Sequence, residues 1–375
     1  MHEACGDGRR LSIGLAVSPT WLRGDAWRAE DSRVEELFDL APFADLAAAA
    51  EAAALDFLFA PDSGFLEPAT LDRAPGFSTH DSHTLVTALA ARTSRIGVVP
   101  TVQTLIDSPY AAARRLMSLH RLSDGRAGWN AVTALGGAEN HGIEAPTGEE
   151  RYSRARAFVD AVRELWGSYP ADALILDRAA GRFADRGRVR RVNRDDGRYR
   201  IAGPLTVAAH PSGEPPLFQA GASPQGVALA GACADAVFAV TGSIDDAASQ
   251  RAALRDAAAR AGRAADAVRF LPGLVVTLAD TRAEARRIAG AQRTGTGPGH
   301  WSVTGTPEDA VEEIAMWARA SAIDGFIALA GGSWRSIELF LGRVVPALVE
   351  RGLFRRGYEG RTLREHLGLR WPSDG

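Results

Sequence analysis

One short motif, residues 221–226, combines a serine, a proline and two glycines in an order that suits anion binding. It follows an apolar run and reads Gly-Ala-Ser-Pro-Gln-Gly. Ser223 can cap a helix that begins at Pro224. The N–H groups of Gln225 and Gly226 would then point at a phosphate, with the helix dipole favouring the negative charge. Helix capping alone explains the same residues, so capping and phosphate binding both remain open.

The same motif resembles the G-x-S-x-G nucleophile elbow of hydrolases, but it has one residue too many. Pro224 also stands directly after the serine. Because that elbow uses the N–H of the following residue as an oxyanion donor, and proline has none, the motif does not support a hydrolase.

Further polar residues stand at the ends of strand-like apolar runs. They are Asp62, Thr101, Thr104 and Asn130. In a barrel of parallel strands, the carboxyl ends of the strands and the loops that follow them carry the reacting groups. Small hydroxyls, one amide and one carboxylate form a hydrogen-bonding set, which suits a bound ligand better than an acid–base pair.

The eight histidines show none of the spacings of a known metal motif, and we predict no metal site. His80 and His83 come nearest to a metal pair, whereas His120 lies on an apolar helix face and suits a structural role. His141 lies in a loop after the fourth strand-like run, a position that favours function.

All 43 residues counted as lysine or arginine are arginine, because the sequence contains no lysine. This excludes chemistry that needs a lysine amine, such as a P-loop, a protein kinase or a Schiff-base enzyme. Any bound phosphate must be held by hydroxyls, backbone amides or arginine.

Strand-like and helix-like runs alternate along the chain. The eight strand candidates are 11–17, 57–59, 96–99, 127–132, 217–219, 236–240, 274–278 and 325–329. Eight alternations in 375 residues, with no G-x-G-x-x-G after the first strand, favour a (β/α)8 TIM barrel, an α/β fold, over a doubly wound sheet. We expect a single domain over residues 1–375, with a tail at about 355–375.

An arginine-rich stretch at about 173–205 interrupts the alternation and is expected to form a β-rich insertion before the fifth strand. Such a charge cluster is typical of a solvated face, so we assign it no ligand. Two helix starts are also predicted. Thr147 with Glu150 resembles a capping box, and Thr306 precedes a proline at the first helical position.

The formal net charge of −3 lacks blocks of like charge and favours neither nucleic acid nor a membrane surface as a partner. No apolar run is long enough to span a membrane, and no signal peptide is evident, so we expect a cytoplasmic protein. Cys5 and Cys233 are too few for a disulfide framework or a zinc site.

The block Asp124–Thr133, which reads Asp-Gly-Arg-Ala-Gly-Trp-Asn-Ala-Val-Thr, is more specific. It is joined by Glu-Arg-Tyr at 150–152, Gly-Pro-Leu at 203–205, Gln-Ala-Gly-Ala-Ser at 219–223 and Gly-Thr-Pro-Glu at 305–308. From about residue 11 to 369 the chain resembles the nitrilotriacetate monooxygenase component A group of bacterial luciferase-like flavin monooxygenases. The resemblance implies a TIM barrel, a homodimer or homotetramer, and reduced FMN (FMNH2) delivered by a separate NAD(P)H:flavin reductase.

The resemblance also implies roles for particular residues. The FMN contacts of the family fall on Asp62, Thr101 or Thr104, Asn130, Tyr152 and Ser223, with Ser223 on the phosphate. In the implied reaction, FMNH2 and O2 form a C4a-hydroperoxyflavin, whose distal oxygen passes to a small organic substrate. Asn130 and His141 are the candidate catalytic residues.

Two departures from the family pattern stand out. The family commonly has a histidine four residues before the tyrosine, where this chain has Gly148, and His141 could replace it. The segment between Arg287 and His300 is short and rich in glycine, which makes a poor lid. Two alternatives therefore stay open: a deazaflavin (F420)-dependent oxidoreductase of the same fold, and a flavin-binding protein without catalysis.

Overall fold

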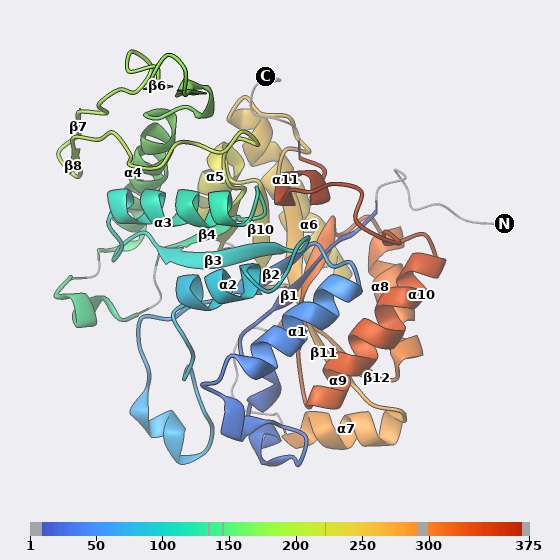
Figure 1. Cartoon of the computed structure of the whole chain (residues 1–375). Coiled ribbons are helices and arrows are strands. Elements are labelled where there is room, and N and C mark those ends of the chain that lie inside the picture. Colours follow the sequence, from blue (N-terminus) through green and yellow to red (C-terminus); the bar gives the residue numbers. More distant parts are fainter. Residues whose placement is uncertain (1–9, 134–135, 145, 222, 292–298, 370–375) are drawn as a thin grey trace.

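Eight parallel strands close into a barrel in the computed structural model, which describes residues 10–133, 136–144, 146–221, 223–291 and 299–369 (Figure 1). In spatial order around the barrel they are β1 (Ser12–Ala16), β2 (Phe57–Ala60), β3 (Gly97–Gln103), β4 (Trp129–Val132), β9 (Leu217–Ala220), β10 (Ala236–Ala239), β11 (Arg269–Leu278) and β13 (Gly325–Ala330). β13 pairs with β1, which completes the ring. The predicted α/β barrel is confirmed.

Helices cover the outside of the barrel and bury their apolar faces against it. They are α1 (Ala41–Ala52), α2 (Ser82–Ala90), α3 (Pro109–Leu122), α4 (Gly148–Gly167), α5 (Pro224–Cys233), α6 (Ile244–Arg260), α7 (Arg282–Ala291), α8 (Pro307–Arg319), α9 (Trp334–Leu339) and α10 (Val345–Glu350). Among the described residues, none of the helices combines the length and apolar character needed to cross a membrane.

A second apolar core fills the inside of the barrel. It contains Phe57, Phe59, Phe218, Leu271 and Ile327, which come from four different strands and are all nearly inaccessible to solvent. Because side chains alternate along a strand, every second residue of each barrel strand faces inward. Thr101 and Asn130 are inward positions nearer the carboxyl ends of β3 and β4.

One strand of the sheet was missed by the sequence prediction. β12 (Trp301–Gly305) pairs with the second half of β11, beyond the part of β11 that pairs with β10. Its burial alternates, with Trp301 and Val303 buried and Ser302 and Thr304 exposed. The sequence alternates with the same period of two, but Ser302 and Thr304 interrupt the continuous apolar run by which the other strands were predicted. The seventh predicted strand was also too short, because β11 begins at Arg269.

The expected β-rich insertion is present as two small hairpins. β5 (Leu174–Asp177) pairs with β6 (Arg182–Ala184), and β7 (Arg194–Asp195) pairs with β8 (Arg200–Ile201). The insertion lies at the upper left of Figure 1, away from the barrel strands.

The C-terminal segment closes the amino end of the barrel. Leu363, in the short helix α11 (Leu363–His366), belongs to the inner core, and a Cβ atom on Gly97 or Gly128 would lie within 2.8 Å of its side chain. The Arg355 guanidinium donates to the buried Asp56 carboxylate at 2.7 Å. The described part of the expected tail is therefore packed against the barrel.

All three predicted helix starts are confirmed, but one of the predicted caps is not formed. Ser223 and Thr306 each cap a helix with a proline in its first turn. The capping box predicted for Thr147 and Glu150 was wrong, because Thr147 is the N-cap residue but its side chain makes no capping hydrogen bond. Glu150 instead pairs with Arg198 of the insertion at 3.0 Å.

Candidate functional site

A hydrogen-bonded chain of polar side chains lies at the carboxyl ends of β2, β3 and β4. The Thr101 hydroxyl donates to the Ala60 carbonyl at 2.8 Å, and the Asn130 amide Nδ2 donates to the Thr101 oxygen at 3.1 Å. With its amide nitrogen engaged, Asn130 is left with a buried oxygen, Oδ1, that has no partner among the described residues. Buried polar atoms are normally hydrogen-bonded, so this acceptor is available to a ligand that carries an N–H or O–H group.

Asp62 supports this arrangement from the side. Its carboxylate accepts the backbone N–H of Ser63 at 2.8 Å and that of Ser82 at 3.1 Å, where α2 begins. Burial raises the pKa of the Asp62 carboxyl above its ordinary value, although the N–H of Ser82 opposes the rise. The Ser82 hydroxyl in turn donates to the Thr101 carbonyl at 3.1 Å. Asp62 thus holds the start of α2 against β3.

Thr104 is engaged differently from Thr101. Its buried hydroxyl donates to the backbone carbonyl of Val132 at 3.0 Å, which ties the end of β3 to the end of β4. Of the two threonines, Thr101 contacts the Asn130 amide.

A second group of side chains surrounds the start of α5. The Ser223 hydroxyl accepts the N–H of Gly226 at 3.1 Å and donates to the phenol oxygen of Tyr152, in α4, at 2.8 Å. The N–H of Gly226 is therefore not free, which corrects the expectation that it would bind a phosphate directly. Gln225 keeps a backbone N–H with no intrahelical partner, as expected for the first turn of a helix.

The side chains near this helix start include an amide as well. Gln219 is buried, and its oxygen Oε1 has no partner among the described residues. A Cβ atom on Gly221 would lie 3.1 Å from the Gln219 amide nitrogen and 3.4 Å from the Tyr152 oxygen. The first turn of α5 contains no acidic residue. The Gln219 amide nitrogen donates to the Ala220 carbonyl at 2.6 Å, so its free oxygen is an acceptor and does not serve an anion. The hydroxyls and the positive end of the helix dipole suit an anion.

The two groups lie on neighbouring strands. β4 pairs with β9, with Asn130 opposite Phe218, and Ser223 follows the end of β9. Tyr152 belongs to α4, the helix after β4. The sequence order therefore brings the buried amide and the serine-capped helix start to the same sector of the barrel.

His141 stands apart from these groups. It is exposed at the end of a short 3-10 helix, Ala138–His141, and no hydrogen bond joins it to Asn130 or Tyr152 among the described residues. Gly148 is the first residue of α4, and the space around a Cβ there is open. The shortened segment after strand seven lies mostly outside the described residues.

The structure adds a residue that the sequence prediction left without a role. His300 lies inside the barrel, because a Cβ atom on Gly273 would be only 2.7 Å from His300 Nδ1, and its ring lies 5.7 Å from that of Phe238. Nδ1 is buried and has no partner among the described residues. Burial lowers the pKa of the His300 ring, and the positive charge of Arg23 lowers it further.

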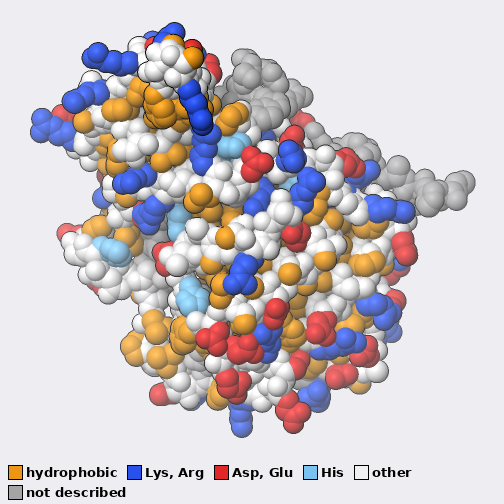
Figure 2. Space-filling model, viewed as in Figure 1, with side chains coloured by type: hydrophobic (Ala, Val, Ile, Leu, Met, Phe, Trp, Pro, Cys, Tyr) orange, Lys and Arg blue, Asp and Glu red, His pale blue; other side chains and the backbone are white. Residues whose placement is uncertain are grey.

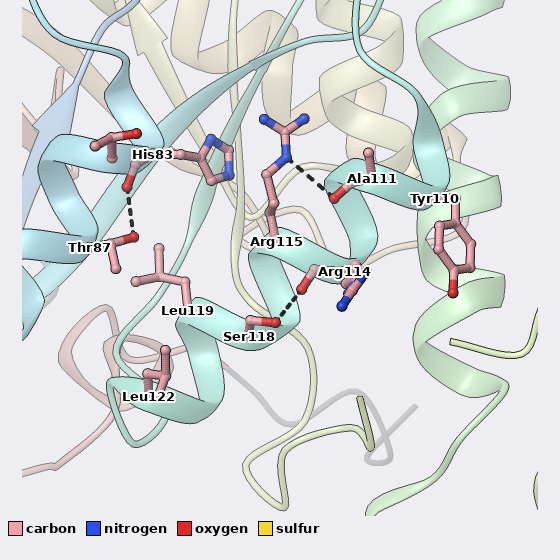
Figure 3. Close-up of a pocket in the computed structure, with 10 residues that line it drawn as sticks. His83, Thr87, Tyr110, Ala111, Arg114, Arg115, Ser118, Leu119 and Leu122 are labelled. Carbon is pink, nitrogen blue, oxygen red and sulfur yellow. Dashed lines mark hydrogen bonds between the residues drawn. The ribbon is translucent and has the colours of Figure 1, made fainter. Parts of the chain in front are cut away.

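A cavity of about 640 Å³ lies elsewhere, between α2 and α3 (Figure 3). Its lining comes only from these two helices and includes His83, Thr87, Tyr110 and Arg115. None of the candidate residues at the strand ends lines this cavity. Among the described residues, no group of three or more histidine, cysteine or acidic side chains could hold a metal ion.

Comparison with known proteins identifies the family of the chain. Residues 17–340 match the family model for luciferase-like monooxygenases. The chain is 30% identical to N-acetyl-S-(2-succino)cysteine monooxygenase of Bacillus subtilis, over 97% of this chain and 98% of that protein. It is 28% identical to nitrilotriacetate monooxygenase component A of Aminobacter aminovorans, over 98% of each.

A solved structure is similar over nearly the same length. EDTA monooxygenase from Chelativorans sp. BNC1 superposes with a TM-score of 0.86 at 28% identity, covering 96% of this chain and 99% of that one. The resemblance stated from the sequence motifs is confirmed. The chain belongs to the luciferase-like monooxygenase family.

Proposed function

We propose that this chain is the oxygenase of a two-component system, which uses FMNH2 from a separate NAD(P)H:flavin reductase to transfer one atom of O2 to a small organic substrate. The related proteins are named monooxygenases, and one is named as component A, which implies a further component. The activity proposed for this chain is likewise that of a monooxygenase, an oxidoreductase.

This proposal rests on two features of neighbouring strands: a serine-capped helix start, and a buried amide oxygen that has no partner in the part of the chain that the structure describes. FMN has an anionic phosphate at one end and a ring with N–H donors at the other. Ser223, Tyr152 and the N–H of Gln225 would hold the phosphate, and Asn130 Oδ1 would accept from the ring. The residues present therefore fit FMN without a lysine.

The bound cofactor would supply the electrons that reduce O2. The protein's own residues have narrower tasks. Thr101 fixes the Asn130 amide so that its oxygen, not its nitrogen, faces the ligand. Phe238 and His300 would occupy the barrel interior beside the ligand and exclude water there. Asp62 would act indirectly, because it holds the start of α2 at Ser82, which in turn contacts the backbone of Thr101.

The test is a binding and turnover comparison on the purified full chain. Oxidised FMN, FMNH2 and the deazaflavin F420 are titrated separately under anaerobic conditions. Because reduced flavin consumes O2 without an enzyme, loss of substrate and formation of oxygenated product are then followed, with a supplied flavin reductase and candidate substrates, among them nitrilotriacetate and N-acetyl-S-(2-succino)cysteine. We expect FMNH2 to bind best, and oxygenated product to form only when the chain, FMNH2, O2 and a substrate are all present.

Two other outcomes would overturn the proposal. Preferential binding of the deazaflavin, with hydride transfer and no oxygen uptake, would make the chain a deazaflavin-dependent oxidoreductase. Flavin binding without loss of any substrate in the panel would leave a flavin-binding protein without catalysis.

A further inference from the structure

One charged side chain at the carboxyl end of the barrel has no role in the candidate site. Arg23 follows β1 after a short 3-10 turn, η1 (Thr20–Leu22), and its backbone N–H donates to the Thr20 carbonyl at 3.4 Å. The Thr20 hydroxyl donates to the carbonyl of Ala330, the last residue of β13, at 2.5 Å. Because β13 is parallel to β1 and pairs with it, this bond holds the turn at the same end of the barrel as the candidate site.

The residues on both sides of Arg23 are anchored. Trp21 and Leu22 are each only 1% exposed. On the other side, the N–H of Asp25 donates to the Ala291 carbonyl at 2.9 Å, where α7 ends. An arginine on an anchored turn loses less conformational freedom on binding a ligand than one on a free loop.

The Arg23 guanidinium forms no ion pair or hydrogen bond with any other residue that the structure describes. Asp25, two positions away in sequence, pairs instead with Arg28 at 3.9 Å. Over the right side of Figure 2, by contrast, blue and red side chains lie beside one another, as paired surface charges do. The Arg23 side chain is exposed to solvent, yet the surrounding protein atoms desolvate it and lower its pKa. A cation that is both accessible and partly desolvated is well placed to attract an anion.

His300 connects Arg23 with the barrel interior, where its ring lies against Gly273 and Phe238. Burial lowers the pKa of this ring, and the nearby positive charge of Arg23 lowers it further, so the ring is neutral at pH 7. Within the described part of the chain, no acidic side chain raises the pKa of either group. This part of the barrel mouth therefore carries a positive charge that is not compensated.

Arg23 lies on the opposite side of the barrel from the proposed phosphate site. In the ring of eight strands, β1 and β9 are four places apart, which is the greatest separation possible. Ser223 follows β9, and Asn130 belongs to β4, which pairs with β9. A flavin held by Ser223 and Asn130 thus leaves Arg23 available to a different anion.

We propose that Arg23 binds a carboxylate group of the substrate at the barrel mouth. The planar guanidinium presents paired N–H donors that match the two oxygens of a carboxylate, and such charge-assisted pairs are strong where water is partly excluded. The bound carboxylate supplies the negative charge that this part of the mouth lacks. The inference rests on the proposed function, because it takes the flavin to occupy the opposite side, and it narrows the substrate to organic acids.

The experiment measures the binding of carboxylates to the full chain, with and without oxidised FMN. Succinate, benzoate and nitrilotriacetate are titrated by calorimetry, each beside the corresponding uncharged amide. Arg23→Gln removes the charge, and Arg23→Lys keeps the charge but not the paired donors. Arg28→Gln is the matched control, because Arg28 belongs to the same loop and pairs with Asp25. Circular dichroism and thermal unfolding show whether each variant is folded.

We expect at least one carboxylate to bind the wild type, and its amide to bind about 10-fold or more weakly. Arg23→Gln should raise the dissociation constant of that carboxylate about 10-fold or more, and Arg23→Lys should raise it less. Arg28→Gln should bind the carboxylate as the wild type does. The affinity for FMN should be the same in all four proteins, which separates this site from the phosphate site.

Equal carboxylate binding by the wild type and Arg23→Gln, or no binding of any carboxylate in the panel, would overturn the proposal. So would an equal loss in Arg28→Gln, which would indicate a general effect of charge, or a matching loss of FMN affinity in Arg23→Gln, which would assign Arg23 to the cofactor. Failure of the proposed function is a separate result, since it appears as a chain that binds no flavin or oxygenates no substrate while carboxylate binding still depends on Arg23.

Discussion

The hydroxyl of Ser223 donates to the phenol oxygen of Tyr152 at 2.8 Å, although the two residues lie on different helices and 71 positions apart in sequence. The same hydroxyl accepts the N–H of Gly226 and so caps α5. Ser223 therefore has its donor and one lone pair engaged, and a phosphate would have to displace or share these contacts. Because Ser223 donates to the phenol oxygen, the Tyr152 hydroxyl keeps its own proton, and we propose that it donates this proton to the phosphate.

Replacing Ser223 with alanine should weaken FMN binding much more than riboflavin binding. A hydrogen bond to a charged group contributes about 1.5–3 kcal/mol, so the dissociation constant of FMN should rise about 10-fold or more. Riboflavin, which lacks the phosphate, should bind as before. Isothermal titration calorimetry with both ligands measures the difference.

Thr306→Ala is the matched control for this variant. Thr306 also caps a helix with proline in its first turn, but that helix, α8, carries no candidate residue. Both variants should lose about 1 kcal/mol of stability with the cap. Equal losses for FMN and riboflavin in Ser223→Ala would contradict the phosphate assignment.

Replacing Asn130 with leucine should impair turnover without destabilising the fold. Leucine has a similar size, and it removes an oxygen that is buried without a partner among the described residues. Removing such an atom costs little stability, whereas loss of the ring contact should lower kcat/KM for FMNH2-dependent product formation about 10-fold. Thr101→Val, which frees the Asn130 amide to turn, should have a smaller effect in the same direction. Full activity of Asn130→Leu with a lowered Tm would instead assign Asn130 a structural role.

The barrel could be predicted from the sequence because most of its strands are short, nearly continuous apolar runs. Buried parallel strands have that signature. β12 lacks it, since one of its faces is exposed and carries Ser302 and Thr304. The prediction of eight barrel strands was therefore correct, while the edge strand beside β11 was missed.

Only part of the candidate site could be predicted from local sequence patterns. Capping chemistry identifies Ser223 because serine followed by proline is a local signal, but the contact with Tyr152 is a long-range packing result. The position of His300 depends on Gly273, whose missing side chain leaves room for the imidazole inside the barrel. No local pattern links these two residues.

A His300→Gln variant should change the pH dependence of the reaction. Burial lowers the pKa of this ring below its ordinary value of about 6.5, so the ring is neutral at pH 7 and gains a proton only at lower pH. If the neutral ring contacts the ligand, wild-type kcat/KM should fall on the acid side of pH 6.5, and glutamine should remove that fall. Initial rates of product formation between pH 5 and 8 provide the profile. An identical acid limb in both proteins would show that another group titrates.

The stability of the fold should decrease as the pH falls from neutral, and His120 should account for part of the decrease. His120 is buried, and burial lowers its pKa to about 3, with the neighbouring His210 contributing. Between this value and about 6.5 the unfolded chain binds a proton that the folded chain does not. The free energy of unfolding must therefore fall as the pH falls through this range.

The size of this effect can be measured with His120→Gln. Removing the titrating ring should reduce the loss of stability between pH 7 and pH 4.5 by about 2 kcal/mol. Some loss should remain, because burial also lowers the pKa of His83 and of His366 to about 4. Urea unfolding at several pH values gives the free energies, and the exposed His141→Gln variant serves as the control. If His120→Gln lost stability as steeply as the wild type, the buried ring could not be the group responsible.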